Sequence, residues 1–165
     1  MDYSLSGQDI KDLLNDEVYI YTYKDLYNFR NIDDLLGKFR KVVVLYLNSL
    51  DYGHWTCLYE HNNTIYFFDS YGAIPDTQQK FIKKDINEYN KQDLKYLLDL
   101  LYSSEKNIEY NQYKLQKFKK GINTCGRWCV VRLQHPEISV DMFAHYFLNQ
   151  NVMNPDELVV KLTNF

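Results

Sequence analysis

Three short segments of the chain carry residue types that could do chemistry: residues 53–55 (GHW), 68–72 (FDSYG) and 123–129 (NTCGRWC). A cysteine can act as a nucleophile, a histidine as its base and a carboxylate as the group that orients the histidine. Singly, each residue has an ordinary explanation, since cysteines often behave as small core residues. Together, Cys125, His54 and Asp69 indicate a nucleophilic cysteine site.

The segments that contain the histidine and the aspartate are expected to form a hairpin. Residues 54–60 (HWTCLYE) and 64–69 (TIYFFD) alternate like strands, and Asn62-Asn63 is typical of a tight turn. If the turn is centred on Asn62, position 54 lies opposite position 70. His54 and Asp69 then share one end of the hairpin, where the carboxylate can hold the imidazole.

Cys125 stands at the start of a helix expected over residues 124–133. The unpaired N–H groups and the dipole at a helix N-terminus favour a thiolate. The same N–H groups can stabilise an oxyanion that forms beside the sulfur. Gly126 is expected to let a substrate backbone approach closely.

The remaining pattern supplies elements that could position these groups. Residues 41–47 (KVVVLYL) predict a strand buried on both faces, and residues 18–23 and 108–116 are expected to be extended. Helices are expected after Ser6 and after Asn154, each an N-cap, and over residues 25–39 (in part), 78–103 (mostly) and 140–148. This order predicts an α+β fold with a small, mostly antiparallel central sheet packed by helices.

Length and composition limit the classes of function. The 165 residues suit one domain, spanning 1–165, with 45% hydrophobic and 25% charged residues. A net charge of −3 excludes a strongly basic nucleic-acid binder. The longest apolar run, 42–47, is far short of the roughly 20 residues that span a bilayer, so no membrane association is expected. Three cysteines cannot all pair, which favours a reducing, intracellular setting.

The three segments in this order and spacing resemble the adenovirus-protease and ubiquitin-like-protein (SUMO) protease superfamily of cysteine peptidases. The resemblance spans most of the chain and is closest to the compact proteases of virophages and large DNA viruses. It implies a papain-like fold of the adenovirus-protease type. By this resemblance Cys125 is the nucleophile that forms a thioester, His54 the base that later protonates the leaving amine, and Asp69 the acceptor of the other imidazole N–H.

The same resemblance implies a glutamine upstream of the cysteine, whose amide completes an oxyanion hole with the backbone N–H of Cys125. Gln116 is the first choice and Gln112 the reserve, since their even spacing would place both on one face of a strand. Gln116 lies further from the cysteine than in many members, which an insertion in the loop 117–124 would explain. Trp55 is expected to pack at the active site, as core or as part of the substrate site.

The implied function is a maturation protease that cleaves capsid or other virion precursor proteins, acting in the virion or the host cell cytoplasm. One alternative is a deubiquitinase-like or SUMO-type isopeptidase, although 165 residues leave little room for a modifier-docking surface. A second is a catalytically inert binding module on the same fold. We expect a monomer without a cofactor, and no metal site because the C-x3-C spacing of Cys125 and Cys129 is not a zinc pattern.

Two groups of lysines remain, and we expect both to be solvated. A sharper alternative for these lysines is a contact with nucleic acid or an acidic substrate. A weak interaction with a nucleic-acid or peptide cofactor is left open. The groups are Lys114, Lys117, Lys119 and Lys120 before the cysteine, and Lys80, Lys83 and Lys84.

Overall fold

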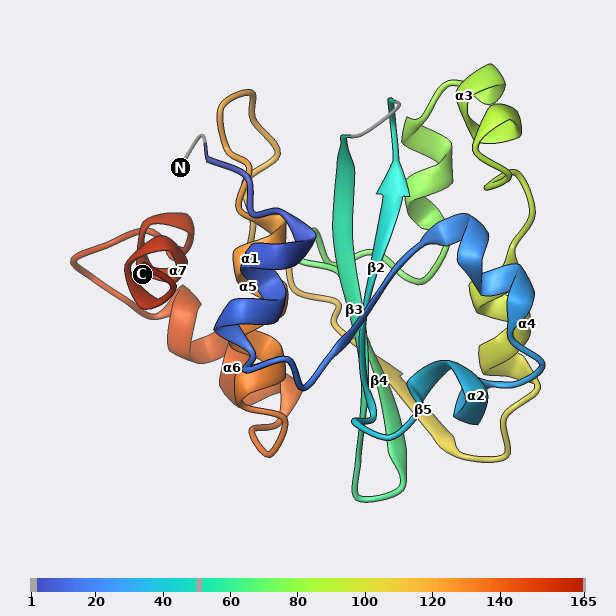
Figure 1. Cartoon of the computed structure of the whole chain (residues 1–165). Helices are drawn as coiled ribbons and strands as arrows, with labels where there is room; N and C mark the ends of the chain where they lie inside the picture. Colours follow the sequence, from blue (N-terminus) through green and yellow to red (C-terminus); the bar gives the residue numbers. More distant parts are fainter. Residues whose placement is uncertain (1–2, 50–51, 165) are drawn as a thin grey trace.

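A computed structural model describes residues 3–49 and 52–164 of the chain. Within that part, a five-stranded sheet in the order β1-β2-β3-β4-β5 runs through the centre of the molecule (Figure 1). The strands are β1 (Tyr19–Thr22), β2 (Lys41–Leu47), β3 (Gly53–His61), β4 (Thr64–Phe68) and β5 (Asn107–Tyr110).

The sheet has antiparallel strands at its centre and parallel strands at its edges. The longest ladders, β2 with β3 and β3 with β4, are antiparallel, whereas β1 joins β2 and β5 joins β4 in parallel. The α+β class with a helix-packed sheet is confirmed. The sheet is more mixed than predicted, because both edge strands enter through crossovers that contain helices.

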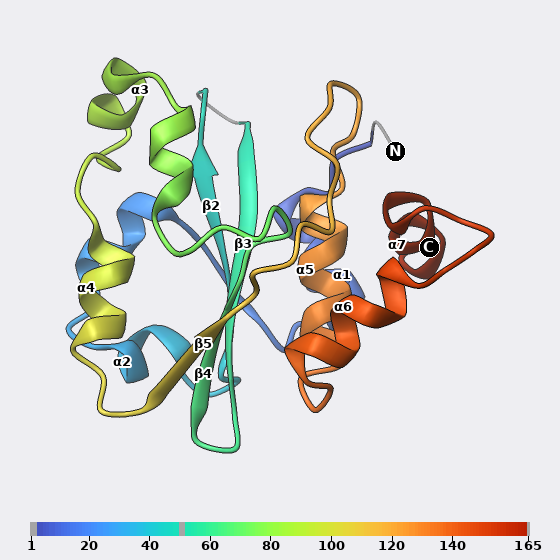
Figure 2. The same cartoon turned by 180° about the vertical axis from the view of Figure 1, so that it is seen from behind.

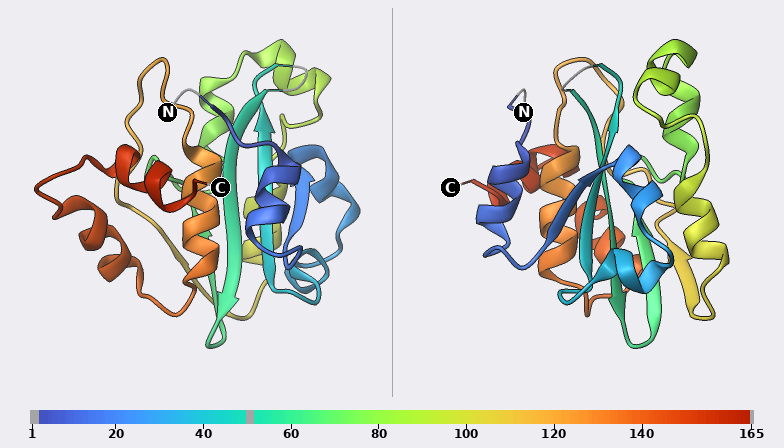
Figure 3. Two further views of the ribbon diagram at one scale, coloured as in Figure 1. Left: turned by 60° about the vertical axis from the view of Figure 1, so that its left-hand side comes forward. Right: turned by 45° about the vertical axis from the view of Figure 1, so that its right-hand side comes forward.

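Helical segments cover both faces of the sheet. On one face lie α1 (Gly7–Leu13), α5 (Cys125–Gln134), α6 (Val140–Leu148) and α7 (Pro155–Leu162) (Figures 1 and 2). On the other lie the 3-10 helix η1 (Tyr23–Asn28), α2 (Ile32–Leu36), α3 (Lys84–Tyr89) and α4 (Tyr96–Tyr102), with the 3-10 helix η2 (Thr77–Phe81) leading into α3. The right-hand view of Figure 3 shows the sheet between these two layers.

The side chains of strand β2 explain why helices cover both faces of the sheet. Its side chains alternate between the faces, so Val43 packs with α5 and α6 residues while Val42 and Val44 pack with α2 and α4 residues. All three valines are fully buried. A continuous apolar strand needs a helical layer on each side, as the sequence predicted.

Helix ends also follow the predicted signals. Ser6 caps α1 through a reciprocal pair of hydrogen bonds with Asp9, and Asn154 accepts a hydrogen bond from the Glu157 N–H at the start of α7. Within residues 3–49 and 52–164, no helix has the length and apolar character needed to cross a membrane.

Most of residues 78–103 are helical, as predicted, but they form three separate elements, η2, α3 and α4, with loops between them. The loop after α3 is tied to the end of β2, where the Gln92 side chain accepts a hydrogen bond of 3.1 Å from the Leu47 N–H. This link draws the chain away from a helical path. Leu94 precedes α4 and is 55% exposed, while Leu97 and Leu101 of that helix are buried.

The strand predicted over residues 108–116 is also shorter than expected. Strand β5 ends at Tyr110, and the segment 111–116 is irregular. Asn111 still donates its N–H to the Phe67 carbonyl, but Leu115 and Gln116 donate theirs to the single carbonyl of Ser70. The segment thus leaves the sheet and turns toward the loop that follows β4.

Candidate active site

His54 and Asp69 meet at one end of the β3–β4 hairpin, as predicted. The Nε2 atom of His54 lies 2.9 Å from Oδ1 of Asp69, and both residues are buried. The predicted register is one residue in error: Cys57 pairs with Phe68, because the turn is centred between Asn62 and Asn63. The ladder ends at this pair. Asp69 is the first residue after β4, and its side chain contacts the imidazole of His54.

The carboxylate of Asp69 is held by further donors. Its Oδ1 accepts a hydrogen bond from the Tyr71 N–H at 2.8 Å, and its Oδ2 accepts one from Nε2 of Gln78 at 2.9 Å. Sequence reasoning missed Gln78, which comes from η2 and belongs to no recognisable motif. These donors satisfy a carboxylate that is fully buried.

Gly53 has a structural reason to precede the histidine. A Cβ atom at this position would lie 1.9 Å from the carbonyl oxygen of Tyr46. Gly53 pairs with Leu47 and His54 with Tyr46 at the end of the β2–β3 ladder. The glycine therefore lets the strands close tightly where the imidazole must be placed.

Cys125 is the first residue of α5, which packs against β3. Its Sγ lies 3.4 Å from the backbone nitrogen of Trp55, which donates a hydrogen bond to it. Cys125 is 5% exposed. The first N–H groups of a helix have no intrahelical partners, so those at the start of α5 are available beside the sulfur. The thiol thus lies beside the strand residue that follows His54.

The electrostatics of His54 link the aspartate to the thiol. Burial opposes the charged imidazole, but the Asp69 charge, its hydrogen bond and a hydrogen bond with Cys125 outweigh this effect. Together they raise the pKa of His54 from 6.5 to about 10. Because Asp69 occupies Nε2, the nitrogen left for the thiol is Nδ1. The site therefore favours an imidazolium beside the sulfur.

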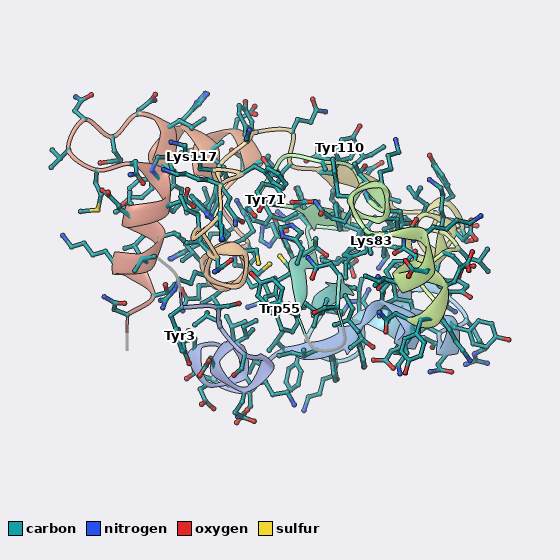
Figure 4. All side chains as sticks on the ribbon, turned by 90° about the horizontal axis from the view of Figure 1, so that it is seen from above. Tyr3, Trp55, Tyr71, Lys83, Tyr110 and Lys117 are labelled. Atoms are coloured by element: carbon teal, nitrogen blue, oxygen red, sulfur yellow. The ribbon has the colours of Figure 1, made fainter. Side chains whose placement is uncertain are left out.

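Aromatic rings form a wall of the site. Tyr71 stacks on the imidazole of His54 with a centroid separation of 4.7 Å, and Phe118 packs edge-on to Tyr71. Figure 4 views this end of the molecule, with Tyr71 lying between Lys117 and Lys83. A pocket of about 140 Å³ opens here, and its lining includes Tyr52, His54, Tyr71, Gln116, Ile122 and Cys125.

The structure distinguishes the two candidate glutamines. Gln116 is buried and lines the same pocket as Cys125, whereas Gln112 is exposed and lines a separate groove between β5 and α6. The expectation that both lie on one strand face is wrong, because the segment is irregular. Loop geometry brings Gln116 to the site.

Gly72 accounts for this loop geometry. Its φ is +78°, and a Cβ there would lie 2.9 Å from the backbone of Tyr113. Asn111 adds a second connection, since its Nδ2 donates to the Asp69 carbonyl at 2.9 Å. The FDSYG segment thus has two contacts: it holds the imidazole of His54 through Asp69, and it packs against residues 111–113, which lead to Gln116.

Gly126 and the Trp55 side chain do not line the pocket. A Cβ on Gly126 would lie 3.1 Å from Cδ1 of Trp55 and 3.2 Å from Cβ of Leu5. The Trp55 indole donates to the Leu5 carbonyl at 3.1 Å. Trp55 and Leu5 therefore fill the space beside Gly126, and the substrate-binding role of Trp55 and Gly126 stays a prediction.

Asp156, at the start of α7, is a buried residue that sequence reasoning missed. One carboxylate oxygen accepts hydrogen bonds from the Thr124 hydroxyl at 2.7 Å and the Trp128 indole at 3.1 Å. The other accepts from the Lys117 N–H at 2.9 Å. Asp156 thereby connects the C-terminal helix to the residue before Cys125 and to the loop that follows Gln116.

The other cysteines and the lysines lie outside the pocket lining. Cys57 and Cys129 are buried free thiols in the core beneath the site, and burial raises the pKa of Cys129 well above its ordinary value.

The described residues contain no group of three or more His, Cys, Asp or Glu side chains that could hold a metal ion. All seven lysines of the two groups are exposed.

The chain is similar to a protein of the Sputnik virophage called "Uncharacterized protein V9". The two are 37% identical over 164 residues, which cover 97% of this chain and 94% of the relative. No family model matches the chain.

Two crystal structures of the ASFV pS273R protease share the fold. Their TM-scores are 0.52 and 0.50, at 11% and 12% identity, and the match covers 99% of this chain and 68% and 67% of theirs. At this level of identity the likeness concerns the fold, and it confirms the expected papain-like protease fold.

Proposed function

From its membership of the family of the Sputnik virophage protein V9, and from its protease fold, we propose that this chain is a virus-type cysteine endopeptidase. One observation carries the proposal: His54 lies between a buried carboxylate and the thiol of Cys125 at the start of a helix. That arrangement can deprotonate the thiol and return a proton to a leaving group.

In the proposed reaction, the Cys125 thiolate attacks the scissile carbonyl and forms a carbon–sulfur bond. The carbonyl oxygen becomes an oxyanion beside the Cys125 N–H and the Gln116 amide. When the carbon–nitrogen bond breaks, the imidazolium of His54 gives its proton to the amine. Water then attacks the thioester, His54 takes its proton, and the thiolate is restored. Asp69 keeps the imidazole in the required tautomer throughout.

Virion proteins are the substrate class that we propose. A virophage protein is the relative at 37% identity, and a protease of a virus has the same fold. The whole chain, residues 1–165, acts as one protease domain, either in the virion or in the host cytoplasm. The small pocket beside Cys125 suits substrates with a small residue before the cleaved bond.

The first experiment is labelling with an electrophilic peptide that ends in a glycyl warhead. The wild type should label, and Cys125→Ser should not, while Cys129→Ser serves as the matched control because that thiol is buried outside the pocket. Equal labelling of the wild type and Cys125→Ser would reject the enzyme proposal.

A second experiment separates the substrate classes. Capsid and other virion precursors are incubated with the enzyme beside a panel of ubiquitin-like fusions. Cleavage of the precursors supports maturation, and cleavage confined to the fusions would support an isopeptidase. Adding DNA or precursor-derived peptides to both reactions tests for a stimulating cofactor, and gel filtration of the enzyme tests the expected monomer.

A further inference from the structure

The side-chain amide of Gln116 makes hydrogen bonds through both its oxygen and its nitrogen, and these contacts define its orientation. Its Nε2 lies 3.2 Å from the Ile122 carbonyl and 3.3 Å from the Tyr71 hydroxyl, while its Oε1 lies 2.7 Å from the hydroxyl of Ser70. A carbonyl only accepts hydrogen bonds, so the nitrogen must be the atom that faces Ile122. The Ser70 hydroxyl must then donate to Oε1.

Ser70 holds the same glutamine through its backbone. The carbonyl of Ser70 accepts a hydrogen bond of 3.0 Å from the Gln116 N–H, in addition to the side-chain contact. Ser70 and Gln116 are both 1% exposed, so water does not compete for these bonds. Ser70 also follows Asp69 directly, which couples the glutamine to the residue that orients His54.

The two hydrogens of the Gln116 amide differ in their availability. One is donated to the fixed Ile122 carbonyl. The other points to the Tyr71 hydroxyl over 3.3 Å, a long contact in the pocket that Cys125 also lines. The Tyr71 hydroxyl can accept a hydrogen bond from another group. The second amide N–H of Gln116 can therefore donate its hydrogen bond to Tyr71 before the reaction and to the oxyanion once it forms, and it has an acceptor in both cases.

We propose that Ser70 is a positioning residue of the oxyanion hole. By donating to Oε1 it keeps the amide nitrogen of Gln116 on the side of the Tyr71 hydroxyl, in the pocket that Cys125 also lines. The Tyr71 hydroxyl occupies the second amide hydrogen until the oxyanion forms. This inference rests on the proposed function, and it assigns a task to the serine of the FDSYG segment that packing alone does not explain.

The test compares Ser70→Ala with Thr56→Val. Thr56 is also fully buried, and its hydroxyl donates to the Val44 carbonyl, so the control loses a buried hydroxyl bond that does not touch Gln116. Hydrolysis of a fluorogenic peptide amide with glycine before the scissile bond gives kcat and KM. Ser70→Thr keeps the hydroxyl and should retain most of the wild-type kcat.

For Ser70→Ala, kcat should fall by about tenfold to a hundredfold, somewhat less than the loss of a whole oxyanion donor, with little change in KM. Alkylation by iodoacetamide forms no oxyanion, so its rate at Cys125 should stay at the wild-type level. Binding of a peptide aldehyde, which forms a tetrahedral adduct, should weaken in parallel with kcat.

Two results would overturn the inference alone: a kcat for Ser70→Ala equal to that of Thr56→Val, or an alkylation rate that falls as much as kcat does. The second result would show damage to the thiol and imidazole and not to the oxyanion hole. If the wild type shows no hydrolysis that depends on Cys125, the proposed function fails and the inference fails with it.

Discussion

Gln78 and Asp69 are joined by a hydrogen bond of 2.9 Å between Nε2 of the glutamine and Oδ2 of the carboxylate. This oxygen is the one that His54 does not use, because the imidazole bonds to Oδ1. The 3-10 helix η2 thus supports the imidazole indirectly, through the carboxylate of Asp69.

Replacing Gln78 with alanine should therefore weaken catalysis without removing a reacting group. Asp69 would lose a donor inside the protein, and its carboxylate would be held less firmly. We expect kcat to fall by roughly threefold to tenfold, with KM nearly unchanged. Gln79→Ala is the control, since Gln79 donates to the Leu94 carbonyl and does not touch Asp69. Equal effects of the two substitutions would contradict the assignment.

Protonation of His54 should make the stability of the protein depend on pH. Its pKa is raised from 6.5 to about 10, so the folded protein binds the proton more tightly than the unfolded chain does. The stabilisation is complete below pH 6.5 and is lost as the pH rises toward 10. A Cys125→Ser background keeps the Asp69 contribution to this rise but not that of the thiol. In that background, we expect the free energy of unfolding to fall by about 2 kcal/mol between about pH 6 and pH 9.5.

The partner measurement uses the Asp69→Asn substitution in that same background. Without the carboxylate, burial alone acts on the imidazole and lowers its pKa. Urea unfolding at both pH values should then show a markedly smaller decline than with Asp69 present. A decline of the same size in the two proteins would mean that other groups cause it.

Asp156→Asn should reduce both stability and activity. An amide can keep one oxygen toward Thr124 and Trp128, but its NH2 group would then face the N–H of Lys117. We expect a loss of roughly 1–3 kcal/mol in the free energy of unfolding. Because Thr124 precedes Cys125, labelling by the glycyl electrophile should also slow. Glu157→Gln, an exposed change in the same helical turn, should leave stability and labelling unaltered.

The two glycines beside the proposed catalytic residues should respond differently to alanine. At Gly53 the added Cβ meets a backbone oxygen at 1.9 Å, so Gly53→Ala should cost more than about 3 kcal/mol. At Gly126 the nearest atoms belong to side chains, and alanine favours the helix. Gly126→Ala should therefore cost about 1 kcal/mol or less. Thermal unfolding of both variants measures this, and equal losses would show that Trp55 and Leu5 cannot shift to admit the added Cβ at Gly126.

The sequence by itself was sufficient to predict the central strands, the ends of several helices and the identity of the proposed triad. These features depend on local patterns: β2 is a continuous apolar run, α7 begins with Asn154 and Pro155, and the hairpin turn is set by Asn62 and Asn63. Local steric and hydrogen-bonding preferences act over a few residues, so they can be read without knowing what lies nearby in space.

Only the tertiary structure placed Gln116, and not Gln112, in the pocket with Cys125, packed Trp55 against Gly126, and brought Gln78 and Asp156 to the site. Each depends on contacts between segments far apart in the chain, such as Gly72 against Tyr113. No periodicity encodes such contacts, because an irregular loop takes its path from the atoms that it packs against. The proposed reacting groups can therefore be predicted from short motifs, whereas the groups that hold them in place come from the packing of the whole domain.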